Sequence, residues 1–158
     1  MLPISCVIIA HNEAENLSRC LASIYGWIKE IIVIINDCTD DTQKIAEGFG
    51  ARVIEHHWEG YAEQKNFGMA CAQEPWILRL DADEEVSETL KQHIEDLFAS
   101  ISSSTYDVIY CKRHNQYLGH WLRYGHSKDI CPILLRKGAV KWIGSVHEGV
   151  RYSGEKHY

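Results

Sequence analysis

Short, largely apolar runs recur along the first part of the chain and alternate with longer segments of mixed polarity. The runs cover residues 4–10, 30–35, 51–55 and 76–80. In the first run, β-branched residues follow one another almost without polar interruption, which is typical of a strand buried on both faces of a sheet. The pattern therefore predicts four strands of a sheet with both faces covered.

The segments between these runs carry apolar residues three or four positions apart, which predicts helices. In the first segment we expect Asn12 to cap a helix and Glu15 to complete a capping box. Its apolar face consists of Leu17, Cys20, Leu21 and Ile24. A second helix is expected to begin at Thr39 or Asp40, a third to cover 61–71 and a fourth to begin at Ser87. Strands that alternate with helices indicate βαβ units and an α/β fold, with a mostly parallel central sheet flanked by helices.

The pattern changes after a polar connection at 100–105. Further strands are predicted at 106–111 and 130–136. Between them, residues 112–124 are rich in aromatic and basic side chains and have no helical period. We expect a single domain over 1–158, made of two halves, 1–105 and 106–158.

Composition narrows the classes of protein. The 158 residues are 46% hydrophobic and carry a net charge of −6 without a basic cluster, so a nucleic-acid backbone is not expected as the main partner. The N-terminus has no basic start and no long apolar core, so we expect neither a signal peptide nor a membrane anchor, and a cytoplasmic location. The six cysteines include no C-x-x-C pair and are expected to be reduced and mostly buried.

Polar residues follow three of the predicted strands directly. His11, Asn12 and Glu13 follow the first strand, Asn36 and Asp37 the second, and Asp81 and Asp83 the fourth. The carboxyl ends of parallel strands meet at one edge of a sheet, where helix N-termini present unpaired N–H groups. Helix capping alone would be the simpler explanation, but the convergence of three such turns favours a ligand site.

The two carboxylates of the Asp-Ala-Asp turn suit a hard divalent cation. Mg²⁺ or Mn²⁺ is commonly bound through one or two carboxylates and the phosphate oxygens of a substrate. An EF-hand does not fit, because Val86 stands where its loop needs glycine. A dinucleotide-binding turn and a P-loop do not fit, because the first strand-to-helix turn has no glycine. An aspartyl phosphatase fits poorly, since Glu85 stands where such enzymes carry a hydroxyl residue.

Several motifs together resemble a known family. Residues 5–13 (SCVIIAHNE), 30–42 (EIIVIINDCTDDT) and 81–83 (DAD) resemble the family 2 inverting glycosyltransferases, which have the GT-A fold, a Rossmann-like nucleotide-binding fold. Residues 59–68 (EGYAEQKNFG) and 145–148 (SVHE) are similar to the branch of lipopolysaccharide inner-core β-1,4-glucosyltransferases. Such enzymes run some tens of residues further, so we expect a C-terminal acceptor-binding or membrane-facing segment to be absent from this chain.

The resemblance implies transfer of a hexose, with glucose from UDP-glucose as the expected donor, to a lipopolysaccharide core sugar. Residues 1–105 would form the half that binds the nucleotide sugar and 106–158 the half that binds the acceptor. The cofactor would be Mg²⁺ or Mn²⁺, and the partner a lipid-linked core oligosaccharide at the cytoplasmic face of a bacterial inner membrane. The oligomeric state stays open.

The resemblance also implies roles for single residues. The Ala10 backbone, His11 and Asp37 would hold the base, Glu13 would lie near the ribose, Lys65 near the diphosphate, and Asp81 near the ribose or metal. Asp83 would be the principal metal ligand, and His147 would complete the metal shell or orient a phosphate. For the catalytic base Glu148 is our choice and Asp129 the second candidate.

The aromatic and basic segment 112–124 is expected to bind the acceptor. Arg113 suits pairing with an acceptor phosphate, and Trp121 suits stacking on a sugar ring. Trp121 and Leu122 would also suit a peripheral contact with the inner membrane. Two other functions stay open at this point: a nucleotide-sugar-binding module without transferase activity, and a metal-dependent phosphatase.

Overall fold

The computed structural model describes residues 1–100, 106–122, 128–144, 149–152 and 155–157. The strands are β1 Leu2–Ala10, β2 Ile28–Ile35, β3 Arg52–Glu55, β4 Trp76–Asp81, β5 Tyr106–His114, β6 Gln116–Tyr117, β7 His120–Trp121, β8 Lys128–Arg136, β9 Val140–Ile143, β10 Gly149–Tyr152 and β11 Glu155–His157. The helices are α1 Ala14–Ile24, α2 Thr42–Gly48, α3 Tyr61–Cys71 and α4 Glu88–Ser100. Each of the six strands and four helices predicted from the sequence is present.

Seven strands form one central sheet in the order β11-β5-β8-β4-β1-β2-β3. Strands β1 to β4 pair in parallel, whereas β8 is antiparallel to both of its neighbours, β4 and β5. The predicted α/β fold with a mostly parallel sheet is therefore confirmed. The parallel register brings Ala10 level with Ile35 and Ile9 level with Asp81, so β1, β2 and β4 end at the same edge.

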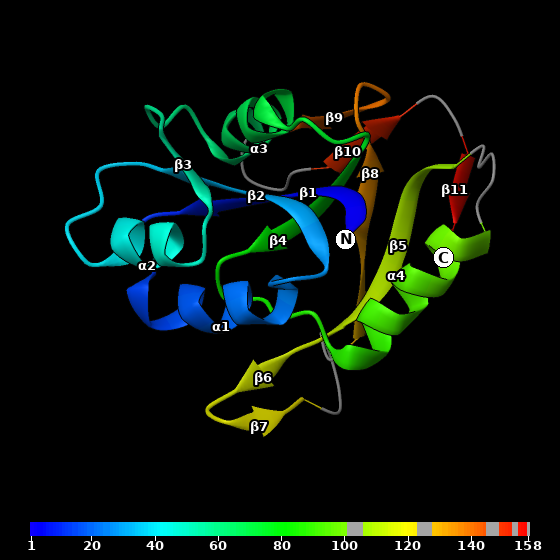
Figure 1. Ribbon diagram of the computed structural model, residues 1–158, viewed down its shortest axis with the longest axis horizontal. Helices are drawn as coiled ribbons and strands as arrows, with labels where there is room; N and C mark the ends of the chain where they lie inside the picture. Colours follow the sequence, from blue (N-terminus) through cyan, green and yellow to red (C-terminus); the bar gives the residue numbers. More distant parts are fainter. Residues whose placement is uncertain (101–105, 123–127, 145–148, 153–154, 158) are drawn as a thin grey trace.

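The two faces of the sheet are covered by different elements (Figure 1). One apolar cluster joins the sheet to α1, α2 and α4, and it includes the four residues of the predicted apolar face of α1. The other joins the sheet to α3 and to β9, through Met69 and Trp142 among others. Covered faces explain why the strands read as continuous apolar runs. No helix in the described part of the chain is long and apolar enough to cross a membrane.

The predicted cap of α1 is wrong. The helix begins at Ala14, and Asn12 stands before it in a left-handed conformation with φ of 54°. The Asn12 side chain instead accepts a hydrogen bond from the Thr39 N–H at 2.8 Å. The first N–H groups of α1 are satisfied from the loop after β2: Glu13 donates to the Thr42 hydroxyl at 2.8 Å and Ala14 to the Asp40 carboxylate at 3.0 Å. The cap therefore comes from a distant part of the sequence.

Residues 112–122 contain a feature that the sequence did not predict. Strand β5 continues to His114, and β6 and β7 then form a short antiparallel hairpin that extends away from the body of the molecule (Figure 1). Its two-residue turn has positive φ at Leu118 (48°) and Gly119 (77°), as in a type I′ turn. Leu118 at 81% and Trp121 at 62% exposure are open to solvent.

All six cysteines are free thiols, as predicted. Only Cys6 and Cys20 are buried, whereas the other four are half-buried, so the prediction that most are buried is wrong. Burial, with a smaller effect from the nearby Glu84, Asp83 and Asp81 carboxylates, raises the pKa of the Cys20 thiol to about 12.

The close approach of α3 to the sheet depends on Gly68. A Cβ added there would stand 2.5 Å from Val7 Cγ1 and 3.1 Å from Ile34 Cγ1. We expect Gly68→Ala to lower the free energy of unfolding by about 1–3 kcal/mol, because the helix must shift away from β1 and β2. Urea unfolding would measure this. Gly48→Ala is the matched control: nothing lies within 4 Å of its added Cβ, and a cost there as large as at Gly68 would contradict the packing argument.

Candidate functional site

The polar turns after β1, β2 and β4 meet at one edge of the sheet, as the sequence predicted. His11 Nδ1 lies 2.6 Å from the Asn36 carbonyl oxygen, which ties the first turn to the second. Asp37 has φ of 44°, and its N–H donates to the Glu55 carboxylate at 2.9 Å. Asn and Asp tolerate the left-handed region better than most residues, so these turns can remain tight without glycine. His11 and Asp37 are exposed on the rim that results.

A cavity of about 420 Å³ opens beside this rim. Five residues assigned from the sequence line it: Glu13, Lys65, Asp81, Asp83 and Arg113. Ile9, Tyr61, Arg79 and Ala82 complete the lining. The cavity therefore lies beyond the carboxyl ends of β1 and β4, at the N-terminal ends of α1 and α3.

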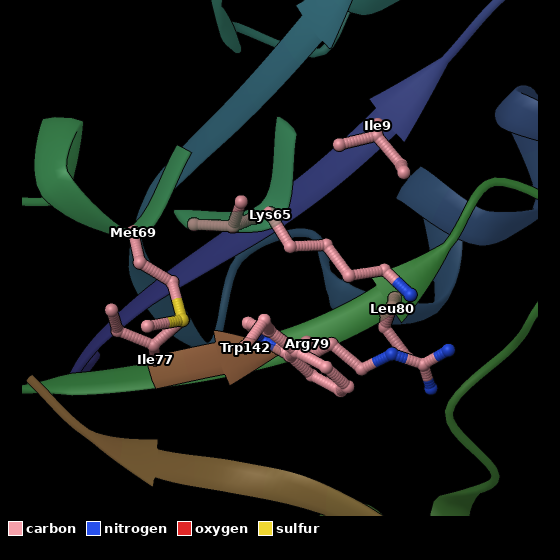
Figure 2. Close-up of a pocket in the computed structure, with 8 residues that line it drawn as sticks. Ile9, Lys65, Met69, Ile77, Arg79, Leu80 and Trp142 are labelled. Atoms are coloured by element: carbon pink, nitrogen blue, oxygen red, sulfur yellow. The ribbon is translucent and has the colours of Figure 1, made fainter. Parts of the chain in front are cut away.

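Two cations lie on the floor of the cavity, although both side chains are nearly buried. Lys65 from α3 is 7% exposed and Arg79 from β4 is 8% exposed. Figure 2 shows the two side chains running in the same direction beside the Trp142 ring, and Lys65 Nζ lies 4.7 Å from the centre of that ring. Buried cations need counter-charges. Asp81 supplies one for both: Oδ1 lies 3.7 Å from Lys65 Nζ, and Oδ2 pairs with the Arg79 guanidinium.

Glu84 is the second anion of this network. Its carboxylate accepts hydrogen bonds from Arg79 Nη1, Arg113 Nη1 and the Asp81 N–H, each at 3.0 Å. Burial alone would lower the pKa of Arg79, but the Asp81 and Glu84 carboxylates raise it above its ordinary value. Arg113 shows the same balance, with Glu84 and Asp129 as its partners. Both guanidinium groups therefore stay charged within the partly buried network.

The four acids of residues 81–85 thus separate into different environments. Asp81 and Glu84 pair with buried or half-buried cations. Asp83 is exposed at the cavity, and Glu85 is half-exposed and lies 3.8 Å from Arg19. Asp83 is consequently the carboxylate of this run that is best placed to meet an incoming cation.

A complete metal site is not preformed in the described part of the chain, where no three Cys, His, Asp or Glu side chains cluster around one point. The carboxylates of Asp81 and Asp83 nevertheless share the cavity wall. This arrangement fits Mg²⁺ or Mn²⁺, which is often held by one or two carboxylates and completed by substrate phosphates and water. His147 and Glu148 lie in residues 145–148, outside the described residues.

The other assigned residues lie near the cavity or apart from it. The Ala10 backbone belongs to the rim. Asp129 on β8 faces Arg113 on β5, and its Oδ2 accepts from Arg113 Nη2 and Asn115 Nδ2, each at 3.2 Å. Arg113 thus reaches the cavity while it is paired with two carboxylates. Trp121 is on the exposed hairpin and is not among the residues that line the cavity.

Sequence reasoning missed Arg79 and Glu84. Arg79 lies inside the apolar run 76–80, and Glu84 lies among the four acids of residues 81–85, so neither stands out in the sequence. The signal was present in the sequence, because an arginine inside a strand with both faces covered needs a buried anion nearby. Residues 81–85 directly follow the strand, so one of their acids could supply that anion only if the chain turned at the end of the strand.

Neighbouring substitutions test this division of the acids. We expect Glu84→Gln to lower the free energy of unfolding by about 1.5–3 kcal/mol, because it removes the charge that accepts from two arginines. Glu85→Gln should change it by less than about 0.5 kcal/mol, because that ion pair is long and solvent-exposed. Urea unfolding of both variants gives the comparison, and equal losses would show that Glu84 has no special structural role.

The sequences of known proteins align with most of this chain. A protein described as an uncharacterized glycosyltransferase of Rickettsia felis is 43% identical over 106 residues, which are 67% of this chain and 38% of that protein. The lipopolysaccharide core biosynthesis glycosyltransferase LpsC of Rhizobium meliloti is 32% identical over 161 aligned residues, covering 94% of this chain and 57% of LpsC. The chain therefore spans about 38% and 57% of the length of these two relatives.

The fold is shared with solved glycosyltransferase structures. Glucosyl-3-phosphoglycerate synthase of Mycobacterium tuberculosis, in complex with Mn²⁺, UDP and glucosyl-3-phosphoglycerate, matches with a TM-score of 0.52 at 20% identity, over 67% of this chain and 42% of that chain. This likeness confirms the predicted GT-A fold. The family model described as glycosyl transferase family 2 matches residues 5–152. The chain belongs to glycosyl transferase family 2.

Proposed function

We propose that this chain is an inverting glycosyltransferase that moves glucose from UDP-glucose to a lipopolysaccharide core sugar with the help of a divalent metal ion. The observation that carries the proposal is the cavity at the ends of β1 and β4, which the exposed Asp83 carboxylate and the Lys65 cation both line. Opposite charges side by side suit a metal ion and a diphosphate bound together. Membership of glycosyl transferase family 2 supports the reaction class.

The rim and cavity offer contacts for each part of the donor. His11 and Asp37 are exposed beside the Ala10 backbone, where a base could stack on the imidazole and donate an N–H to the carboxylate. Glu13 lies on the cavity wall at the start of α1, within the region proposed for the ribose. Lys65 lies on the cavity floor and is proposed to bind the diphosphate.

Asp83 is the proposed principal ligand of Mg²⁺ or Mn²⁺, with Asp81 and His147 as further ligands. The ion would supply positive charge that stabilises the departing diphosphate. No proton needs to reach that leaving group, so a single carboxylate base is sufficient for the chemistry. The base removes the proton of the acceptor hydroxyl as its oxygen attacks the anomeric carbon opposite the diphosphate.

Glu148 is the proposed base, and Asp129 is the second candidate. Asp129 Oδ2 already accepts hydrogen bonds from Arg113 and Asn115, which leaves it less available to an acceptor hydroxyl and favours Glu148. The proposed acceptor contacts are Arg113 at the cavity and Trp121 on the hairpin, in the half of the domain formed by 106–158. Residues 1–105 form the proposed donor half.

The donor and acceptor rest on similarity rather than on geometry. LpsC is a glycosyltransferase of lipopolysaccharide core biosynthesis, and the mycobacterial synthase was crystallised with UDP, Mn²⁺ and a glucosylated product. Together with the motifs at 59–68 and 145–148, these support UDP-glucose and a lipid-linked core oligosaccharide. The proposed location is the cytoplasmic face of a bacterial inner membrane, with the hairpin as a peripheral contact.

A second function is favoured by one observation. The proposed donor residues Lys65 and Asp83 line the cavity, whereas Trp121, a proposed acceptor contact, is not among its lining residues, which favours a nucleotide-sugar-binding module. Such a module would bind UDP-glucose with a metal ion and transfer no sugar to any core oligosaccharide.

Calorimetric titration with UDP-glucose tests the donor site. In Mn²⁺ we expect binding at least about tenfold tighter than in EDTA, which corresponds to about 1.4 kcal/mol. Asp83→Ala in Mn²⁺ should bind no more tightly than the unmodified protein in EDTA. Glu85→Gln, in the same acidic run, is the matched control and should retain the metal effect. Absence of binding in every condition would exclude the proposed function.

Substitution of the two candidate bases separates their roles. Glu148→Gln should lower the turnover of glucose transfer at least about a hundredfold, the usual scale for loss of a general base, with UDP-glucose affinity unchanged. Asp129→Asn should retain most of the turnover. The measurements are transfer to purified core oligosaccharide and calorimetry of donor binding. The reverse pattern would make Asp129 the base, and no transfer by the unmodified chain would favour the binding module.

A further inference from the structure

Arg79 is a buried cation that the proposed reaction leaves without a role. It lies in β4, the strand at the centre of the sheet order, and its side chain is more than nine-tenths buried. A buried arginine costs free energy unless its charge and its N–H groups are all matched. Most of the nitrogens of the Arg79 guanidinium have a carboxylate partner, but one of them has none.

The two terminal nitrogens of Arg79 have partners. Nη2 pairs with Asp81 Oδ2, and Nη1 donates to Glu84 Oε2 at 3.0 Å. Lys65 Nζ lies 3.7 Å from the other oxygen of Asp81. Each oxygen of the Asp81 carboxylate therefore already faces a cation before any ligand arrives, and a metal ion could take Asp81 only in competition with them.

The third nitrogen of Arg79, Nε, is buried and has no hydrogen-bond partner. Unpaired buried donors are rare in folded proteins, and each calls for an explanation. The same side chain lines the large cavity of about 420 Å³ and the small one of about 10 Å³ shown in Figure 2. Lys65 also lines both, so the two cations together face the space proposed for the donor.

We propose that Arg79, together with Lys65, is a built-in cationic site for the diphosphate of the nucleotide donor, so that part of the affinity for UDP does not depend on a metal ion. The inference rests on the proposed function and adds a donor-binding residue and a second source of positive charge to it. Phosphate oxygens are strong acceptors, and a guanidinium binds them through parallel N–H groups. They would supply the acceptor that Arg79 lacks.

The two sources of charge should then act on opposite sides of the diphosphate. Asp83, exposed on the wall, recruits the metal ion, whereas Arg79 and Lys65 on the floor are already held by Asp81 and Glu84 before metal or donor arrives. Because the floor cations are already held in place, donor binding need not order them. Preorganisation of this kind lowers the cost of binding.

Calorimetry with UDP as the probe, in Mn²⁺ and in EDTA, tests the inference. Arg79→Gln/Glu84→Gln removes the cation together with its anion, so neither is left buried without a counter-charge. In EDTA this variant should bind UDP about ten- to a hundredfold more weakly than the unmodified protein, the range for a hydrogen bond to a charged group. In Mn²⁺ the loss should be at most about fivefold, because the metal ion supplies most of the charge there.

Two comparisons sharpen the result. Asp83→Ala should show the opposite pattern, with the UDP affinity in Mn²⁺ lowered to the value of the unmodified protein in EDTA and the affinity in EDTA unchanged. Lys29→Gln/Glu74→Gln removes an exposed ion pair with an N–O distance of 3.5 Å at the other edge of the sheet and should leave both affinities unchanged. If the Arg79 and Glu84 double variant does not fold, judged by circular dichroism, Arg79→Lys replaces it. It retains the charge, lacks Nε, and should lose at least about threefold in EDTA.

The outcomes separate this inference from the proposed function. Binding of UDP in Mn²⁺ with none in EDTA would overturn the role of Arg79 and leave the proposed function standing. Binding in EDTA that the Arg79 variants do not weaken would also overturn it. No binding in either condition would overturn the proposed function itself.

Discussion

A buried arginine governs the geometry at the end of the central strand. Arg79 lies in β4, which has parallel β1 on one side and antiparallel β8 on the other. Its charge can be neutralised only by residues at the carboxyl end of the strand, and Asp81 and Glu84 take that role. The Glu84 carboxylate also accepts the Asp81 N–H, so the ion pair and the turn stabilise each other. The turn that follows leaves Asp83 exposed at the cavity.

The same network connects the two halves of the domain. Glu84 on the turn after β4 pairs with Arg113 on β5, and Arg113 pairs with Asp129 on β8. Cationic and anionic side chains therefore alternate in a series of ion pairs that runs from Lys65 in α3 to Asp129 on β8. A disturbance of any single charge in such a chain leaves a partly buried neighbour unmatched, which is costly. These ion pairs therefore tie α3 and the turn after β4 to β5 and β8.

The sequence predicted the elements better than their connections. Helix 14–24 and the strands were found because apolar periodicity reflects local burial. The cap of α1 was missed because its acceptors, Asp40 and Thr42, are 26 and 29 residues away from the groups they bind. The β6–β7 hairpin was missed because its Leu118-Gly119 turn lacks the Asn-Gly or Asp-Gly signal of a type I′ turn.

The outline of the site could be predicted for a physical reason. The same reason explains which of its residues the sequence did not reveal. Parallel pairing forces the ends of β1, β2 and β4 to one edge, so any polar residues that follow those strands must gather there. Pairing between charges is not constrained in this way, because it depends on how far each side chain reaches: Glu84 accepts from Arg79, five residues away, and from Arg113, 29 residues away. Residues 81–85 therefore hold four acids in different environments: Asp81 and Glu84 are balanced by cations inside the domain, whereas Asp83 and Glu85 are exposed. Composition alone could not distinguish them, because their partners are set by side-chain contacts in the folded domain.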